Sequence, residues 1–218
     1  MIMKSVLVIG MGRFGRHLAK RMLDLGNDVM IVDSNEKLIE ELSVTFEDSQ
    51  IGDCTNESVI KSLGVDQFDI CFVTMGEDFQ SSLVITSLLK KYNAKFVMAK
   101  ANQDIQADLL KKIGADEIVY PEKETANRLA VRYNAKNVFD YIPLTSEFSL
   151  YEIPIIPDWA GKTIFDIDVR KKYKVNIIAV KKGNTLQSLP GADYRFDFDD
   201  HIVIIGASAD VFKLTSKT

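Results

Sequence analysis

The chain opens on a strongly apolar stretch that gives way to a helical pattern. Residues 6–9 are all β-branched or leucine, which is typical of a strand buried on both faces of a parallel sheet. From Phe14 to Leu25 the apolar positions recur at helical spacing, with charged residues between them. A second apolar run at residues 29–32 then predicts another buried strand. The pattern indicates a strand–helix–strand unit of the kind found in parallel sheets.

The same alternation continues to residue 120. Apolar runs predict further strands at residues 68–74, 95–100 and 117–120, and residues 49–53 are interpreted as the end of another strand. Amphipathic segments predict helices at 37–44, 57–63, 79–92 and 103–113. Strands that alternate with helices imply right-handed crossovers. We therefore expect an α/β fold, a doubly wound parallel Rossmann-like sheet.

The pattern changes after Pro121. We expect a helix at residues 124–133, a short apolar segment at 138–143, alternating positions from Phe148, a short helix after Gly161, strands at 175–180 and 200–206, and a terminal helix. These elements predict a small α+β domain. The predicted domains are residues 1–140 and 141–218. A second domain this small buries a thin core, which favours pairing with another copy.

Three glycines after the first strand carry the clearest chemical signal. Gly10, Gly12 and Gly15 form a G-x-G-x-x-G turn, which would make the tight turn, admit a pyrophosphate to the backbone and let the helix lie close to the strand. Phosphates belong at the N-terminus of that helix. Asp33 ends the second strand, where a carboxylate accepts both ribose hydroxyls of an adenosine and repels a 2′-phosphate.

Other candidate ligand contacts follow the remaining strands. Asp53, Thr74 and Lys100 fall at carboxyl ends of predicted strands, where ligands of open parallel sheets bind. Asp53 could instead cap the next helix together with Thr55. Lys100 could reach a phosphate, act as a dehydrogenase acid, or face solvent. Arg13, inside the glycine turn, suits a triphosphate better than a diphosphate.

Composition narrows the function classes. The formal net charge of −4, from 27 basic and 31 acidic residues, lacks the basic surplus that nucleic-acid binding demands. The apolar runs are strand-length and no secretory signal is visible, so we expect neither membrane insertion nor export. Two cysteines are too few for a disulfide framework or a zinc cluster, and a reducing cytoplasm is the expected compartment.

Several segments together resemble a known family. They are Val-Ile-Gly-Met-Gly-Arg-Phe-Gly at residues 8–15, Val-Asp-Ser-Asn at 32–35, Gly-Asp-Cys-Thr at 52–55, Lys-Lys-Ile-Gly-Ala-Asp at 111–116 and Pro-Glu-Lys-Glu at 121–124. In this order they resemble the RCK proteins, and more narrowly the cytosolic regulatory subunits of Ktr and Trk potassium-uptake systems, of the KtrA/TrkA type. The resemblance covers the whole chain and includes an RCK-C-like second half.

The resemblance implies a gate without enzymatic activity. ATP or ADP would set the shape of a homodimer-based octameric ring that docks on a membrane-embedded potassium transporter at the inner face of the membrane. The implied nucleotide contacts are Arg13 and Phe14 in the glycine turn, Asp33, Asn35, Asp53, Cys54 and Thr55. Cys54 replaces the small residue usual at its position. Glu122 matches an acid that helps to hold Mg²⁺ or Ca²⁺, although it could equally be an acid at a helix N-terminus.

A rival function stays open. The same fold would serve an NAD-dependent oxidoreductase or an NAD(H) redox sensor equally well. A dehydrogenase needs a proton donor and a substrate domain, and two poorly placed histidines with a small second domain offer little of either. A redox-state repressor is a third alternative, against which the charge balance and the missing helix-turn-helix pattern both count.

Overall fold

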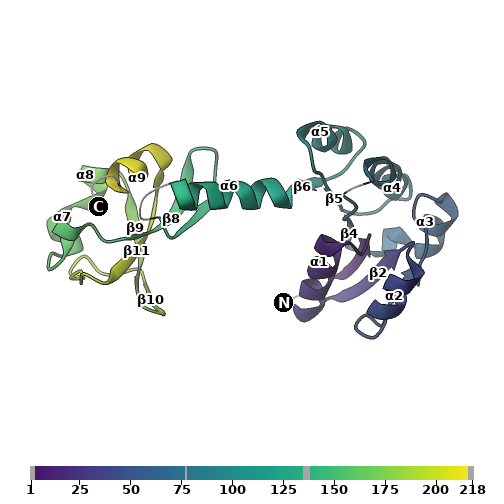
Figure 1. Cartoon of the computed structure of the whole chain (residues 1–218), viewed down its shortest axis with the longest axis horizontal. Helices are drawn as coiled ribbons and strands as arrows, with labels where there is room; N and C mark the ends of the chain where they lie inside the picture. Colours follow the sequence, from purple (N-terminus) through teal and green to yellow (C-terminus); the bar gives the residue numbers. More distant parts are fainter. Residues whose placement is uncertain (1–2, 77, 135–137, 216–218) are drawn as a thin grey trace. The chain divides into compact units, whose positions relative to one another are not determined.

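The structure, a computed structural model, describes residues 3–76, 78–134 and 138–215. The chain divides into two compact units, Met1–Lys123 and Glu124–Thr218 (Figure 1). Each unit has its own sheet and its own buried core. No helix among the described residues is both long and apolar enough to cross a lipid bilayer.

The first unit is built on a six-stranded sheet in which every pairing is parallel. The strand order is β3-β2-β1-β4-β5-β6, which confirms the predicted doubly wound fold. The strands are β1 (Ser5–Ile9), β2 (Asp28–Asp33), β3 (Ser49–Ile51), β4 (Ile70–Val73), β5 (Val97–Lys100) and β6 (Glu117–Val119). The order reverses at β1, between β2 and β4, where sheets of this kind open a crevice.

Both faces of this sheet are covered, and the alternation along β1 shows how. Leu7 and Ile9 pack with buried residues of α3 (Glu57–Leu63), α4 (Phe79–Lys91) and α5 (Asp104–Lys112). Val6 and Val8 point the other way and pack with residues of α1 (Arg13–Asp24) and α2 (Glu36–Leu42). A short 3-10 turn, Val65–Gln67, precedes β4. The continuous apolar run of β1 is therefore required, because neither face meets solvent.

The helix predicted at residues 124–133 is longer in the structure. It begins at Pro121 and ends at Asn134 as α6, with proline in the first turn, where a missing N–H costs nothing. The division between the units falls inside this helix, whereas the sequence predicts a boundary after residue 140. Residues beyond 123 group with the second unit because Val131 packs on its core and Arg128 pairs with Asp140 at 3.0 Å.

The second unit holds a five-stranded sheet in the order β10-β9-β11-β8-β7, with every pairing antiparallel. Its strands are β7 (Asp140–Pro143), β8 (Phe148–Pro154), β9 (Asn176–Lys182), β10 (Thr185–Ser188) and β11 (Asp200–Ala207). Helices α7 (Ile164–Ile167), α8 (Val169–Tyr173) and α9 (Ser208–Thr215) and a 3-10 turn, Pro157–Trp159, complete it. The predicted small α+β domain is confirmed, with β10 as a strand that the sequence does not predict.

Candidate functional site

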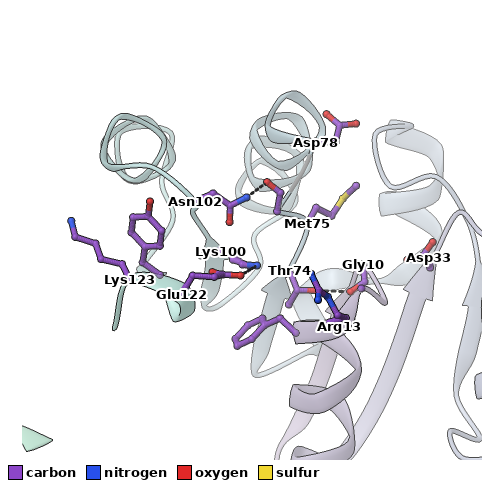
Figure 2. Close-up of a pocket in the computed structure, with 14 residues that line it drawn as sticks. Gly10, Arg13, Asp33, Thr74, Met75, Asp78, Lys100, Asn102, Glu122 and Lys123 are labelled. Carbon is purple, nitrogen blue, oxygen red and sulfur yellow. Dashed lines mark hydrogen bonds and ion pairs between the residues drawn. The ribbon is translucent and has the colours of Figure 1, made fainter. Parts of the chain in front are cut away.

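A cavity of about 670 Å³ opens in the first unit at the carboxyl ends of its strands (Figure 2). Its residues come from the ends of β1, β2, β4, β5 and β6 and from the first turns of α1 and α6. They are Gly10, Gly12, Arg13, Phe14, Asp33, Thr74, Met75, Gly76, Asp78, Lys100, Asn102, Tyr120, Glu122 and Lys123. The cavity lies where the strand order reverses, the place at which this sheet architecture binds ligands.

The glycine turn has the geometry that its sequence predicts. Gly10 has a φ of +95°, a conformation that disfavours any other residue. A Cβ on Gly15 would lie 2.1 Å from the Gly10 carbonyl oxygen, so helix α1 approaches β1 only because Gly15 has no side chain. Gly12 has open space around it and, as the N-cap of α1, offers no side chain to its N–H groups. The first-turn amides of α1 are therefore left for a ligand.

Thr74, a predicted ligand contact, holds this turn in place. Its hydroxyl is buried, and its one proton is shared between the carbonyls of Ile9, at 3.0 Å, and Gly10; Figure 2 shows the contact with Gly10. The residue lines the cavity, but its one hydroxyl donor is directed at backbone carbonyls. Its role is to fix the position of the glycine turn relative to β4.

The Asp33 carboxylate lies beside the glycine turn and has a defined orientation. Its Oδ2 accepts the Met11 N–H at 2.6 Å and its Oδ1 accepts the Asn35 N–H at 2.8 Å. A carboxylate offers about four acceptor positions, so both oxygens keep one for a ligand. The Asn35 side chain caps α2 by accepting the Leu38 N–H at 3.2 Å, and it does not line the cavity.

Asp53 and Cys54, which follow β3, border a smaller hollow that Asp33 and Gly10 also line, and Thr55 is not among its lining residues. Asp53 accepts the Thr55 N–H at 2.9 Å and its hydroxyl at 2.7 Å, so the two residues form a turn rather than a helix cap. The cap of α3 is Asn56. Cys54 is 3% exposed, and burial, with Asp53 and Asp33 close by, raises the pKa of its thiol to about 12. Cys54 therefore packs as a neutral side chain.

Arg13 is the first residue of α1, and its side chain extends into the cavity. Its guanidinium makes no hydrogen bond or ion pair with any residue that the structure describes. It is close enough to Glu122 to help lower the pKa of that carboxyl. An exposed arginine at a helix N-terminus, over a glycine turn, provides a strong site for an additional anionic group.

Lys100 and Glu122 form an ion pair across the far side of the cavity, with Nζ 2.7 Å from Oε1 (Figure 2). The lysine side chain is 11% exposed and its ammonium lies 5.8 Å from the centre of the Phe14 ring. The hydrogen bond from Lys100 holds the pKa of Glu122 below its usual value, against a smaller opposing effect of burial. Glu122 is therefore an ionised carboxylate on the first turn of α6.

Among the described residues, no preformed cluster of metal ligands accompanies the cation site predicted at Glu122. Within residues 3–76, 78–134 and 138–215 no three His, Cys, Asp or Glu side chains gather as metal ligands. A single carboxylate and phosphate oxygens would still suit Mg²⁺ or Ca²⁺, which prefer oxygen ligands. Any cation at Glu122 would thus need oxygen atoms from a ligand.

Six residues that line the cavity are not predicted from the sequence: Met75, Gly76, Asp78, Asn102, Tyr120 and Lys123. The amide of Asn102 donates to the Gly76 carbonyl, which joins the loops after β4 and β5 (Figure 2). Their common signal is position, since they follow the carboxyl ends of β4, β5 and β6. The rule that locates Asp33 and Lys100 would have found them too, but none carries a motif of its own.

Comparison with known proteins gives full-length relatives. The TrkA-N domain model matches residues 6–121 and the TrkA-C domain model matches residues 150–217. Ktr system potassium uptake protein C of Bacillus subtilis (strain 168) is 37% identical over 214 residues, 98% of this chain and 97% of that protein. Ktr system potassium uptake protein A of Vibrio alginolyticus is 32% identical over 203 residues, covering 93% and 92%.

Two solved structures share the fold. The GsuK RCK domain superposes with a TM-score of 0.69 at 18% identity, over 99% of this chain and 47% of that one. The GsuK channel bound to NAD gives a TM-score of 0.66 at 17% identity, over 98% of this chain and 39% of that one. This chain therefore spans less than half of either protein.

Proposed function

This chain belongs to the family of Ktr potassium uptake proteins, built from a TrkA-N and a TrkA-C domain, and we propose that it is the nucleotide-sensing regulatory subunit of a potassium transporter. The observation that carries the proposal is the pairing of two features in one cavity. Asp33 is held ready to accept ribose hydroxyls, and Arg13 has no partner among the described residues. Together they fit an adenosine polyphosphate.

In this proposal, different residues bind different groups of the nucleotide. The α1 amides and the turn of Gly10, Gly12 and Gly15 bind the inner phosphates. Asp33 binds the ribose, and the hollow beside Asp53 and Cys54 lies on the adenine side. Arg13 reaches the third phosphate, which ATP has and ADP lacks. Glu122 and the phosphate oxygens would hold Mg²⁺ or Ca²⁺.

The regulatory role follows from a difference between ligands. A ligand shifts a conformational equilibrium only by its differential affinity for the two states. Since Arg13 discriminates the third phosphate, ATP and ADP would stabilise different states of the chain. We infer that ATP favours the open transporter and ADP the closed one, and that the chain itself has no catalytic residues.

NAD or NADH is the second candidate ligand. The cavity also extends beyond the glycine turn and Asp33 to Asn102 and Tyr120, which follow the ends of β5 and β6. A solved protein of the same fold, the GsuK channel, is described as bound to NAD. Such a ligand would leave the regulatory role intact and change only what is sensed.

The proposed partner is the membrane-embedded subunit of a Ktr or Trk system, which would place this chain at the cytoplasmic face of the membrane. We also propose a homodimer that assembles into an octameric ring. Support for self-association comes from the edge of the second sheet, where Ile142, Leu144 and Phe148 are between 44% and 49% exposed. Large exposed apolar side chains on an edge strand, on its turn and at the start of the next strand favour an interface between proteins.

Ligand choice tests the binding proposal. Unfolding of the purified chain would be followed with ATP, ADP, AMP, NAD and NADH at about a hundredfold over Kd, where a true ligand adds about 2.7 kcal/mol to the free energy of unfolding. We expect ATP and ADP to stabilise the chain. Stabilisation by NADH alone would replace the adenine-nucleotide proposal with the redox-sensing one.

Gating needs a second measurement, because binding alone does not establish it. The chain would be added to liposomes that contain a Ktr-type transporter subunit, and potassium flux would be measured with ATP and then with ADP. We expect faster flux with ATP. Equal flux with both nucleotides, at concentrations that saturate binding, would reject the regulatory role.

A further inference from the structure

The ammonium group of Lys100 is largely enclosed by neighbouring residues, and its ion pair with Glu122 is the contact that a bound ligand would change. The side chain is 11% exposed at the end of β5, with the Phe14 ring 5.8 Å from Nζ. A Cβ placed on Gly76 would lie 3.1 Å from the same nitrogen, so the loop after β4 also closes on it. Burial of a lysine is costly unless its charge is compensated.

Among the described residues, the compensation of this charge is incomplete. A lysine ammonium has three N–H donors, and within the described part of the chain Lys100 uses one of them, toward Glu122 Oε1 at 2.7 Å. The cavity that it lines also receives Arg13 and the N-terminus of α1. All three features favour an anion at this place.

The two partners of the ion pair differ in exposure. Lys100 ends β5, which is paired on both sides by β4 and β6, and its side chain is 11% exposed, whereas the Glu122 side chain is 64% exposed on the first turn of α6. A phosphate group brings more charge and more acceptor oxygens than one carboxylate. When both compete for Lys100, the exposed carboxylate is the group that can leave.

We propose that Lys100 exchanges Glu122 for a phosphate of the bound nucleotide, so that the Glu122 carboxylate is released only when the cavity is filled. This inference rests on the proposed nucleotide site and assigns it an order of events. The anion binds first, and the carboxylate then becomes available to a cation beside the phosphates. Glu122 thus competes with the metal-free nucleotide for the lysine.

Two single variants should change nucleotide affinity in opposite directions. With ADP as the probe and EDTA present, Lys100→Met loses a phosphate contact and should bind about five- to tenfold more weakly. Glu122→Gln removes the competitor and should bind about threefold more tightly. Lys100→Arg keeps the charge and should stay within about twofold of the wild type. Calorimetry on the full chain measures all of these.

The double variant separates exchange from direct repulsion. If Glu122 acts by occupying Lys100, its replacement has no effect once the lysine is gone, and Lys100→Met/Glu122→Gln binds ADP as Lys100→Met does. If the carboxylate merely repels phosphate, Glu122→Gln tightens binding equally in both backgrounds. That second result would overturn the exchange.

A matched control distinguishes a purely structural ion pair. Lys90 pairs with Asp116 at 2.8 Å, is 28% exposed and lies outside the cavity, so Lys90→Met should leave ADP affinity unchanged. If Lys100→Met and Glu122→Gln both weaken ADP, or neither changes it while the wild type binds, the exchange is wrong and the nucleotide site stands. If the wild type binds no ADP, both proposals fail together.

Discussion

The Asp33 carboxylate accepts the backbone N–H of Met11 across 2.6 Å, which ties the end of β2 to the glycine turn after β1. The two residues are 22 positions apart in the chain. A charge-assisted hydrogen bond of this kind is stronger than a neutral one. Asp33 is therefore part of the ligand site and also part of the structure that shapes the turn.

Asp33→Ala should weaken every adenosine ligand together. Loss of the ribose contact, with charge-assisted bonds worth about 1.5–3 kcal/mol each, predicts a fall in affinity of about one to two orders of magnitude. The free energy of unfolding should also fall, because the Met11 and Asn35 N–H groups lose their acceptors. Calorimetry with ATP and ADP measures the first effect. Asp28→Ala, at the exposed opposite end of β2, is the control, and equal binding by both variants would remove Asp33 from the site.

Arg13→Ala should weaken ATP more than ADP. The guanidinium has no described partner within the chain, so its removal costs little stability and its effect falls on the ligand. We expect about a tenfold greater loss for ATP, which corresponds to one charge-assisted contact to the third phosphate. Arg16 is an exposed residue three positions further along α1, so Arg16→Ala should change neither the ATP nor the ADP affinity. Equal losses of ATP and ADP in Arg13→Ala would leave a nucleotide site without discrimination.

Gly15→Ala and Gly12→Ala should differ sharply although the residues are three positions apart. A methyl group at Gly15 would lie 2.1 Å from the Gly10 carbonyl oxygen and 2.5 Å from the Thr74 hydroxyl oxygen. Relief of that overlap requires α1 to move, at about 1–3 kcal/mol or more. Nothing lies within 4 Å of a Cβ on Gly12, so its variant should lose only the N-cap preference of glycine over alanine, about 0.5–1 kcal/mol, and should be clearly the more stable of the two. Circular dichroism in urea measures both, and similar stabilities would contradict the close approach of α1 to β1.

The two cysteines should be unreactive in the folded chain. Burial raises the pKa of both Cys54 and Cys71 to about 12, with Asp53 and Asp33 adding to the effect at Cys54. At pH 8 almost none of either thiol is the reactive thiolate. A thiol reagent should therefore modify the chain only after denaturant is added, as mass spectrometry would show. Rapid modification of the native chain at pH 8 would contradict the packed position of Cys54.

The stability of the second unit should fall in acid, in part through Glu152. Burial alone would raise the pKa of Glu152, but the hydrogen bonds from Lys181 at 2.8 Å and His201 at 3.0 Å outweigh it and hold the pKa below its usual value. A lowered pKa stabilises the fold above the unfolded-state value, and the benefit disappears as the pH falls through the folded-state value. The difference in unfolding free energy between wild type and Glu152→Gln should therefore shrink from pH 6 toward pH 3. Trp159, the single tryptophan and a core residue of this unit, reports it by fluorescence. A difference independent of pH would contradict the ion pairs.

Sequence patterns were informative wherever a residue's environment repeats with the local period. The strands of the first unit are buried on both faces, so their apolar runs stand out, and the Gly10–Gly15 turn carries its geometry in its own spacing. The sequence does not predict β10, because all four of its residues are exposed and it exists by pairing with β9. Backbone hydrogen bonds between β10 and β9 are not visible in the pattern of hydrophobic and polar residues.

The sequence by itself determined the fold class of both units and the position of the glycine turn and Asp33, because these depend on local periodicity and on the rule for strand ends. Tertiary structure decided what each candidate touches. It turned Thr74 toward backbone carbonyls, made Asn35 a helix cap and buried Cys54. It also joined Lys100 to Glu122, which are 22 positions apart in the chain. They meet only because β5 ends, and α6 begins, at the same edge of the sheet. No local pattern encodes such a pair, since both residues read as ordinary exposed charges until the chain has folded.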